Sequence, residues 1–501
     1  MKFRLPRSTH NWMTLIGATI ATISFSMIVF LFTITVFMRE SHAYLGLIIY
    51  IILPAVMILG LVMIPIGMIR QRRRNKISGT TQVLDWPRVD LNDTRHRNAF
   101  MIFAMVTTIL LFASAVGSYE AFHFTESTTF CGTLCHSVMH PEYTAYQHSS
   151  HARVACVDCH VGSGADWYVR SKLSGLYQVY SVLANKYPRP IPTPVENLRP
   201  ARETCETCHW PEKFYARELR HETHYKLDEE STQWDIQLLL KIGAEKSALG
   251  LKEGIHWHIN PDTKIEYIAT DEKREKLPWV RYTNLKTGEI KTFNDDEEPL
   301  DEDAIKNAEI HTMDCMDCHN RPSHDYRPPV EFVNHAITAG KISTDLPEIK
   351  SLLMDICDAE FTSMDSAKAA IAKQISEFYQ EDYPDIYQEK KALIDQAIVA
   401  MQEVFSQNIF PDMGVRWDKY PNHIGHTNFD GCFRCHNDTH ANDDGEVISK
   451  DCNLCHSILA QGSPGEMEFA SVGKGLDFRH PDDDEDWKDG LCTDCHTGLN
   501  P

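Results

Sequence analysis

A single five-residue pattern, C-x-x-C-H, occurs six times in this chain and constrains its fold more than any other feature. The chain has 15 cysteines and 25 histidines in 501 residues. That composition predicts roughly 0.02 copies by chance, and the pattern is the attachment signature of c-type haem. Two thiols bond to the porphyrin edge, and the histidine that follows binds the iron from one face. The six copies are Cys156, Cys159 and His160; Cys205, Cys208 and His209; Cys315, Cys318 and His319; Cys432, Cys435 and His436; Cys452, Cys455 and His456; and Cys492, Cys495 and His496.

A seventh pair of cysteines, in "FCGTLCHSVMH", departs from this pattern because three residues separate Cys131 from Cys135. Two thioether bonds can still form at this spacing, and His136 and Met139 then compete for the iron. In one interpretation His136 binds normally and Met139 only packs. In the other, this haem has an altered or missing ligand and a tuned potential. Either way, the sequence predicts seven covalently bound haem c groups.

Zinc and disulfide bonds are the competing uses of paired cysteines. Zinc also binds C-x-x-C pairs, and a disulfide is the default for cysteine outside the cytoplasm. Neither requires a histidine directly after every second cysteine, so the spacing favours haem over both. The remaining cysteine, Cys357, lies in the apolar segment "SLLMDICDAEF". It is expected to be a buried free thiol, because free cysteine packs as a small hydrophobe.

Three apolar segments near the N-terminus predict a membrane anchor. Residues 11–38 and 44–69 carry no charged side chain, and residues 99–118 are almost as apolar. Each is long enough to cross a hydrocarbon core of about 30 Å as a helix. A cleaved signal peptide is the alternative for the first, but that segment is too long, shows no small-residue cleavage site and is followed by two more. Positive residues before the first segment and at 70–76 place the N-terminus in the cytoplasm and all the cysteines outside.

The fold class that follows is mainly α. Three N-terminal transmembrane helices lead into a multihaem region of short helices and loops with little β structure, where the haems supply apolar bulk. Alternation with turn residues predicts a few strands in the charged segment 210–310, and apolar residues at i, i+3 and i+4 predict helices within 345–408. The predicted domains are a membrane anchor at 1–118, a tetrahaem domain at 119–330 with an insertion at about 210–310, a helical connector at 331–415 and a trihaem domain at 416–501.

Each six-coordinate iron needs a second axial ligand, and a second histidine gives a lower potential than a methionine. Histidines close to an attachment motif are the first candidates, and five are placed in this way: His151, His324, His426, His440 and His480. Four more histidines compete for the haem left over: His221, His224, His311 and His335. Three that flank the apolar segments are interpreted as non-ligands: His10, His42 and His96.

Residues 99–330 resemble the NapC/NirT family of membrane-anchored tetrahaem quinol dehydrogenases. The resemblance rests on one apolar segment followed, in order, by "FCGTLCHSVM", "SSHARVACVDCH", "ETCETCHWP" and "MDCMDCHNRPSH". The full arrangement of three spans and seven motifs is similar to the inner-membrane heptahaem quinol oxidoreductases of metal-respiring bacteria. Residues 1–98 and 331–501 lie outside the tetrahaem pattern.

The resemblance implies menaquinol oxidation at the membrane surface beside the first haem, whose axial ligand in the family can be a methionine that matches Met139. The family's quinol-site lysine matches Lys172. Its nearby acidic residue falls on or near Gln178, which cannot accept a quinol proton. One of four other residues would then have to accept it: Glu120, His123, Glu142 or Asp166.

The resemblance also implies outer ligands. It pairs a histidine before the second motif with the fourth haem and a histidine after the fourth motif with the third, which carries over to His151 and His324. The outer ligand of the second haem can come from a partner protein in the family. Here His221 or His224, in "LRHETHYK", could provide it instead.

The expected function is that of an inner-membrane menaquinol dehydrogenase in anaerobic or extracellular respiration. Its N-terminus would be cytoplasmic and its haem region periplasmic, and electrons would leave to soluble periplasmic multihaem cytochromes. The chain shows no nucleotide-binding loop and no nucleophile–base pair, and nucleic acid is not an expected partner, whereas an oligomer is possible. The alternatives are a terminal reductase of a small nitrogen compound and a passive electron-relay subunit of a larger complex.

The formal charge of −21 is concentrated outside the apolar segments, in stretches such as "NDDEEPLDED" and "HPDDDEDWKD". One interpretation is a solvated surface. The other is a docking face for a basic electron carrier, since opposed electrostatic fields steer encounter and raise association rates.

Overall fold

The structure is a computed structural model. It describes residues 9–38, 53–77, 91–94, 97–98, 101, 105, 120, 123–133, 136–162, 164–194, 199–210, 214–243, 254–482, 486–488 and 490–500. Contacts divide the chain into two compact units. The anchor unit comprises Met1–Ser127 and His160–Tyr177, and the motif unit comprises Thr128–Cys159 and Gln178–Pro501. Every described attachment cysteine belongs to the motif unit.

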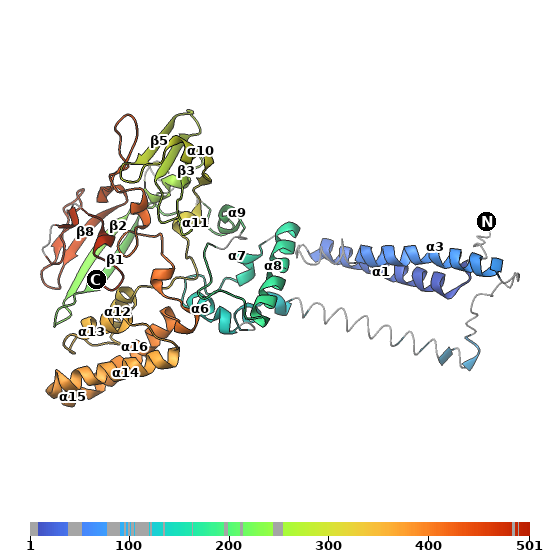
Figure 1. The fold of residues 1–501 in the computed structure, drawn as a ribbon, viewed down its shortest axis with the longest axis horizontal. Coiled ribbons are helices and arrows are strands. Elements are labelled where there is room, and N and C mark those ends of the chain that lie inside the picture. The colour runs from blue at the N-terminus through green and yellow to red at the C-terminus, as the bar shows by residue number, and fades with distance from the viewer. Residues whose placement is uncertain are drawn as a thin grey trace. The chain divides into compact units, whose positions relative to one another are not determined.

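The described part of the anchor unit contains two helices that are long and apolar enough to cross a membrane. They are α1 (Trp12–Met38) and α3 (Leu53–Ile77), drawn in blue in Figure 1. The end of α3 carries the basic run that begins at Arg70. The third predicted span, 99–118, lies outside the described residues except for positions 101 and 105.

Glycine sets how closely α1 and α3 pack. A Cβ added at Gly60 would lie 2.8 Å from the carbonyl oxygen of Gly17, and one added at Gly67 would lie 2.7 Å from the hydroxyl of Thr14. No larger side chain fits these positions, and small residues are what allow helices to approach closely within a membrane. The order of these contacts makes the two helices antiparallel.

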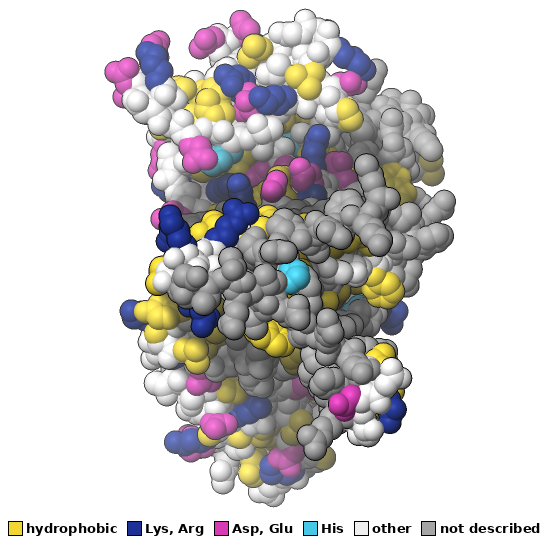
Figure 2. Space-filling model, turned by 90° about the vertical axis from the view of Figure 1, so that its right-hand side faces the viewer, with side chains coloured by type: hydrophobic (Ala, Val, Ile, Leu, Met, Phe, Trp, Pro, Cys, Tyr) yellow, Lys and Arg dark blue, Asp and Glu magenta, His cyan; other side chains and the backbone are white. Residues whose placement is uncertain are grey.

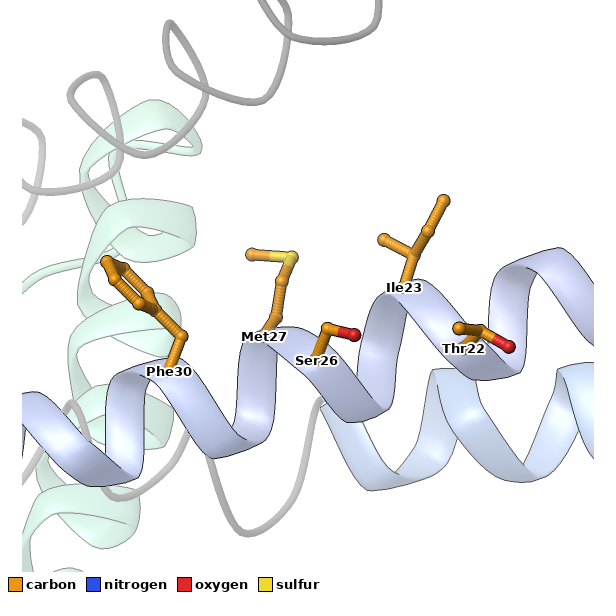
Figure 3. Close-up of a pocket in the computed structure, with 5 residues that line it drawn as sticks. All are labelled: Thr22, Ile23, Ser26, Met27 and Phe30. Carbon is orange, nitrogen blue, oxygen red and sulfur yellow. The ribbon is translucent and has the colours of Figure 1, made fainter.

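A shallow hollow of about 270 Å³ lies along α1. In Figure 3 the apolar side chains that line it project from one side of the helix. None of its lining residues is charged, so the hollow suits an alkyl chain better than a group that exchanges protons. The lining residues are Thr22, Ile23, Ser26, Met27 and Phe30.

Short helices follow the two long helices along the chain, as the sequence predicted. Several coincide with attachment motifs. They are α5 (Thr128–Thr133), α6 (His136–Gln147), α7 (Cys156–His160), α8 (Ala165–Leu183) and α9 (Ala201–Cys205), followed further on by α10 (Glu302–Asn307) and α11 (Cys315–Cys318).

Two antiparallel sheets also lie in the motif unit (Figure 1). They confirm the few strands predicted at 210–310, but they also include strands near the C-terminus that the sequence did not predict. The four-stranded sheet has the order β1-β2-β8-β9, and the five-stranded sheet has the order β6-β3-β4-β5-β7. The strands are β1 (Glu218–Tyr225), β2 (Gln233–Leu240), β3 (Thr263–Ile268), β4 (Trp279–Asn284), β5 (Ile290–Asp295), β6 (His311–Thr312), β7 (His440–Ala441), β8 (His456–Gly462) and β9 (Glu468–Phe469).

The excess of β structure has a physical cause. Strands of the charged insertion pair with strands near the C-terminus: Leu240 of β2 lies opposite His456 of β8, and Asp295 of β5 lies opposite His440 of β7. A strand is stabilised by the neighbours against which it packs, and local periodicity cannot reveal neighbours so distant in sequence. The insertion and the C-terminal segment therefore share both sheets.

The helices predicted between the motif groups are present. They surround the largest hydrophobic cluster of the described residues, which includes Leu353, Ile371 and Met401. Cys357 is buried in this cluster, as expected of a free thiol. The helices are α12 (Pro329–Thr338), α13 (Ile349–Asp358), α14 (Met364–Glu381), α15 (Pro384–Glu389) and α16 (Lys391–Asn408).

A buried lysine in this helical connector makes stability depend on pH. Lys350 is inaccessible to solvent and donates to the carbonyl oxygen of Tyr225 and, at 2.7 Å, to Oδ1 of Asn334. Burial lowers the pKa of Lys350 from 10.5 to about 7. Between these values the unfolded chain binds a proton that the folded chain does not, so stability rises with pH across this range.

Lys350→Met should remove that rise. We expect the unfolding free energy of the variant, followed by far-UV circular dichroism, to climb less than that of the parent from pH 7 to about pH 10. Lys373→Met, at an exposed lysine of α14, is the control and should keep the parental slope. Parallel curves for all three proteins would contradict the prediction.

Candidate functional site

The six C-x-x-C-H motifs begin in short turns of α or 3₁₀ helix, but only α7 contains a whole motif: α9 ends at Cys205, and His456 of the sixth motif already begins strand β8. Where a motif is helical, its residues at i, i+3 and i+4 lie on one face, so both thiols and the imidazole point to the same side. The turn is closed by the histidine, whose backbone N–H donates to the carbonyl of the first cysteine at 2.7 Å in the motif of His209 and 2.8 Å in that of His319. The motif turns are α7, α9 and α11, and the 3₁₀ helices η8 (Gly431–Arg434), η9 (Cys452–Leu454) and η11 (Cys492–Asp494).

Neighbouring thiols connect the motifs in their sequence order. In the first and third of the pairs named below, a hydrogen bond with the other thiol is the main cause of a raised cysteine pKa. In the other four pairs burial is the main cause, and the charge of the neighbouring thiol raises the pKa further. Each motif is thus next to the one that follows it, from the first to the seventh. The pairs are Cys131 with Cys156, Cys159 with Cys208, Cys205 with Cys315, Cys318 with Cys432, Cys432 with Cys455, and Cys452 with Cys492.

Five motif histidines face a second histidine across a narrow gap. The two ring centres lie 5.8 to 6.4 Å apart. The pairs are His209 with His151 (5.9 Å), His319 with His256 (6.4 Å), His436 with His258 (5.8 Å), His456 with His426 (6.3 Å) and His496 with His480 (6.1 Å).

This spacing fits an iron held between two imidazoles. With a metal–nitrogen bond of about 2 Å and a ring nitrogen about 1.1 Å from its ring centre, opposed ligands have centres roughly 6 Å apart. Rings in direct contact lie closer here: His426 stacks on Phe433 at 4.2 Å, and His256 stacks on Phe214 at 4.3 Å. The facing pairs therefore leave the gap that a haem iron requires. Bound there, haem c would supply a one-electron redox centre.

Backbone carbonyls orient several of these imidazoles. Nδ1 of His151 lies 3.0 Å from the carbonyl oxygen of Pro322, Nδ1 of His258 lies 2.8 Å from that of Ile255, and Nδ1 of His436 lies 2.9 Å from that of Ser449. An N–H at Nδ1 that donates to a carbonyl leaves Nε2 free, which is how metal-ligating histidines are commonly held.

The sequence selected three of the five facing histidines, namely His151, His426 and His480, and it missed His256 and His258. These two lie in the 3₁₀ helix η5 (Ile255–Ile259), inside the insertion and far from any motif. The available signal was "GIHWHIN", in which imidazoles alternate with apolar residues within a charged segment. His151 faces the third motif, whereas the resemblance implied the fourth.

His440 departs from its predicted role as a ligand. It is almost fully buried, with Nδ1 2.9 Å from Oδ1 of Asn437 and Nε2 2.8 Å from the carbonyl oxygen of Leu277. Both ring nitrogens are thus engaged by protein groups, and neither is left for iron. His440 begins β7, an edge strand of the five-stranded sheet.

Other candidate histidines also have protein partners. Nε2 of His221 lies 3.2 Å from Asp235, and Nε2 of His224 lies 3.8 Å from Glu222. His324 is oriented by the carbonyl of Glu142, 3.0 Å from its Nδ1. The remaining two contacts join His311 to Glu309 at 3.9 Å and His335 to Arg327 at 3.4 Å.

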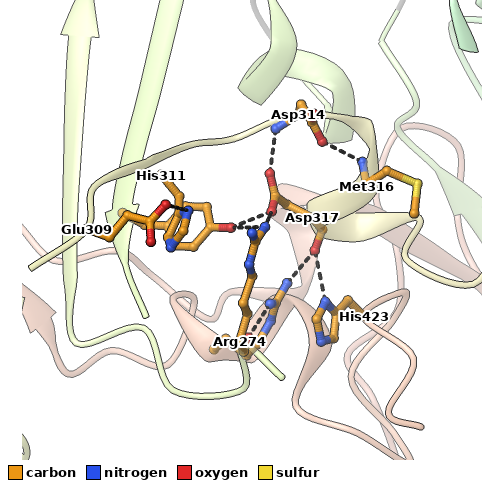
Figure 4. A network of polar contacts seen from close by, with 9 residues as sticks. Arg274, Glu309, His311, Asp314, Met316, Asp317 and His423 are labelled. Atoms are coloured by element: carbon orange, nitrogen blue, oxygen red, sulfur yellow. Dashed lines mark hydrogen bonds and ion pairs between the residues drawn. The ribbon is translucent and has the colours of Figure 1, made fainter. Parts of the chain in front are cut away.

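A buried carboxylate fixes the fourth motif to its surroundings (Figure 4). Asp317, between the two cysteines of that motif, accepts from Arg274 at 2.8 Å and from the hydroxyl of Tyr267. Its carbonyl accepts from Arg434 at 2.8 Å and from Nδ1 of His423 at 3.1 Å. Because Arg434 lies between the cysteines of the fifth motif, this network joins two motifs and the insertion.

His423 was not selected from the sequence. It is buried, and burial together with the charge of Arg434 lowers its pKa to about 3. Its Nε2 has no hydrogen-bond partner among the described residues. The histidine is therefore neutral at ordinary pH and oriented through Nδ1 in the manner of a ligand.

Comparison with known proteins decides the family. The NapC/NirT cytochrome c family, N-terminal region, matches residues 93–190. The chain is 44% identical over 488 residues to the cytochrome c-type protein ImcH of Geobacter sulfurreducens, an alignment that covers 97% of this chain and 95% of that protein. This chain belongs to the NapC/NirT family of c-type cytochromes.

The cytochrome is also 28% identical over 117 residues to the cytochrome c-type protein NrfH of Wolinella succinogenes, which covers 21% of this chain and 66% of that protein. No solved structure gives a significant match. Membership confirms the resemblance drawn from the four motifs. It means that the cytochrome binds haem c covalently, transfers electrons and is anchored in a membrane.

The first motif of the cytochrome is described only in part. Cys131 lies within α5, whereas Cys135 lies outside the described residues. His136 begins α6, although the structure does not describe its side chain, and Met139 follows within the same helix, partly buried.

The candidate quinol-site residues, namely the two matched to the family and the four proposed proton acceptors, are distributed over both units. Glu120, His123 and Asp166 are exposed in the anchor unit. Lys172 belongs to α8, but its side chain lies outside the described residues. In the motif unit, Gln178 is exposed, and Glu142 is half-buried with a pKa raised by burial.

Removal of the carboxylate of Asp317 should destabilise the cytochrome. Asp317→Ala leaves Arg274 and Tyr267 without their buried acceptor, a loss that typically costs about 3–5 kcal/mol. We expect a lower midpoint of chemical unfolding. As a control, Glu298→Ala breaks an ion pair with Lys276 whose side chains are 58% and 60% exposed, and this variant should unfold almost as the parent does. Equal midpoints for the two variants would contradict the prediction.

Proposed function

We propose that this cytochrome is an inner-membrane menaquinol dehydrogenase that passes electrons through seven haem c groups to carriers in the periplasm. The observation that carries the proposal is the row of motifs: five motif histidines each face a second histidine, Arg434 of the fifth motif donates to the carbonyl of Asp317 in the fourth, and the cysteines of each motif neighbour those of the next. Electrons can move in short steps along such a row. Its first motif follows the membrane anchor directly in sequence, where a lipid-soluble donor would arrive.

The proposed topology places the N-terminus in the cytoplasm and the motif unit in the periplasm. The basic run at the end of α3, which includes Arg70, Arg74 and Lys76, favours the cytoplasmic side. A third span at 99–118 would then carry the chain out. All the cysteines of the motifs lie after that span. In this topology every haem is therefore attached on the periplasmic side.

Electron relay is favoured over reduction of a small nitrogen compound. At five motifs a second imidazole stands opposite the motif histidine. An iron held from both faces has no open position for a substrate. The first motif is where coordination would differ. There, Met139 in place of His136 would raise the potential, and an empty outer position would leave the iron five-coordinate.

Quinol oxidation needs residues that bind the hydroxyl groups and receive their protons. We assign the first task to Lys172, which matches the family's lysine and can hydrogen-bond a quinol oxygen. Gln178 can position the ring but cannot take a proton. Asp166 and Glu120, which are solvent-exposed, can accept protons and release them to water.

Quinol oxidation by the purified cytochrome tests the proposal. A menaquinol analogue should reduce the haems of the detergent-solubilised chain, as followed by their absorption. Lys172→Ala should slow this reduction roughly tenfold, which corresponds to loss of one charged hydrogen bond worth about 1.5 kcal/mol. Lys186→Ala, further along the chain, should not slow it. In every variant a chemical reductant should reduce all the haems.

The outcome separates the proposal from its alternative. If the analogue left the parent oxidised while the chemical reductant worked, the chain would be a relay subunit that receives electrons from another protein. If Lys172→Ala matched the parent, quinol oxidation would stand and the assignment of Lys172 would fall.

A basic periplasmic cytochrome is the proposed electron acceptor. The acidic stretch that runs from the end of β5 into the start of α10 is exposed, including Asp296, Glu297 and Glu302. Of the second acidic stretch, residues 480–482 and 486–488 are described, and residues 483–485 and 489 lie outside the described residues. On the face drawn in Figure 2, acidic and basic side chains are interspersed, so docking would depend on a local acidic stretch and not on a whole acidic face.

Reduction of a lysine-rich carrier should therefore fall at least about tenfold as salt is raised from low to physiological strength. The triple variant Asp296→Asn, Glu297→Gln, Glu302→Gln should be slower at low salt and less sensitive to salt. A matched triple variant on the connector, Glu381→Gln, Asp385→Asn, Glu389→Gln, should behave as the parent. A salt response that is flat in all three proteins would remove the docking proposal.

A further inference from the structure

We infer that the single turn η5 supplies the outer axial ligands of two successive haems, His256 to the fourth and His258 to the fifth. The turn would thereby join the motif group at 131–319 to the group at 432–496. This inference rests on the proposed row of haems and deepens it at the one step where the two groups meet.

The ring geometry is the first support. The ring centre of His256 lies 6.4 Å from that of His319, and the ring centre of His258 lies 5.8 Å from that of His436. Both gaps match an iron between two imidazoles. Nδ1 of His258 is held by the carbonyl of Ile255 at 2.8 Å, which leaves Nε2 for the metal.

The helical geometry explains how one turn can serve two irons. A 3₁₀ helix has about three residues per turn, so side chains two positions apart point roughly 120° away from each other. His256 and His258 therefore project toward different partners. Only Trp257 separates them, so their Cα atoms are at most about 7 Å apart. Trp257 stacks on Tyr282 of β4 with ring centres 5.3 Å apart, which fixes the turn to the five-stranded sheet.

An independent set of contacts brings the same two motifs together. Arg434 of the fifth motif donates from Nη2 to the carbonyl of Asp317 in the fourth motif at 2.8 Å, and from Nη1 to the carbonyl of Arg274 in the insertion at 2.6 Å. The thiol of Cys318 also has the thiol of Cys432 as a neighbour. None of these contacts involves η5, yet they join the motifs whose histidines η5 faces.

Axial ligands that share one backbone turn hold two irons at a fixed separation, which is what electron passage between two groups requires. The insertion would thus hold the haems of the two motif groups at a fixed separation, so its role lies in electron transfer and not only at the surface. It lies beyond the stretch matched by the family's N-terminal region, so this arrangement is a property of the longer chain.

Loss of either imidazole should leave one haem iron with an open axial position. In the full-length cytochrome reduced with a chemical reductant, His256→Gly and His258→Gly should each bind one more equivalent of carbon monoxide than the parent. The oxidised variants should gain one high-spin haem signal in magnetic resonance, and the mass should stay that of the fully attached protein. Added imidazole should restore the low-spin signal. Trp257→Phe, in the same turn, should bind carbon monoxide as the parent does.

A second substitution at each position tests the inference even if the glycine variants fold poorly. His256→Met and His258→Met keep a ligand at each position, and each should raise the reduction potential of one haem and add a sulfur-to-iron absorption band. Parental carbon monoxide binding in the glycine variants, or unchanged potentials in the methionine variants, would overturn the inference. Because these readouts use a chemical reductant, they hold or fail independently of quinol oxidation.

Discussion

An iron held between two imidazoles requires ring centres roughly 6 Å apart on opposite sides of a flat porphyrin, and this requirement organises the motif unit. The C-x-x-C-H segment supplies the first of the two imidazoles locally, because its thiols and its imidazole lie on the same face. The other imidazole must come from elsewhere and arrive within a few tenths of an ångström. His258 reaches His436 from a different part of the chain, so the path of the backbone is set by where second histidines are needed.

The apolar packing is consistent with that requirement. The one large hydrophobic cluster of the described residues lies in the helical connector, around residues such as Leu353 and Ile394. The clusters nearer the motifs are small, like the one around Tyr267 and Val280. A loop-rich region with so little apolar side-chain volume needs another source of buried surface, and attached porphyrins would provide it. Buried polar contacts such as those of Asp317 then fix the orientation of neighbouring motifs.

How much could be predicted from the sequence follows from how local each feature is. The attachment turns, the connector helices and the buried Cys357 are determined by residues a few positions apart, and the sequence predicted them. The sequence also predicted strands in the insertion, but the strands near the C-terminus and the facing histidines of η5 depend on pairings between distant segments, such as β2 with β8, which carry no local signature. His440 shows the opposite error. It lies close to two motifs in sequence and was therefore predicted as a ligand, yet its two ring nitrogens contact Asn437 and the carbonyl of Leu277.

The insertion brings these two kinds of constraint together. Its strands complete sheets with the C-terminal segment, and its Arg274 binds both the carboxylate of Asp317 and, through its own carbonyl, Arg434. A segment held at that many points can place the two imidazoles of η5 accurately, whereas a flexible loop could not. The pairing of the insertion with the C-terminal segment is therefore the physical reason that the two imidazoles, which the sequence missed, lie opposite the histidines of the fourth and fifth motifs. On the proposed electron path, an electron that passes from the fourth motif to the fifth would cross a junction built by residues from three separate parts of the chain.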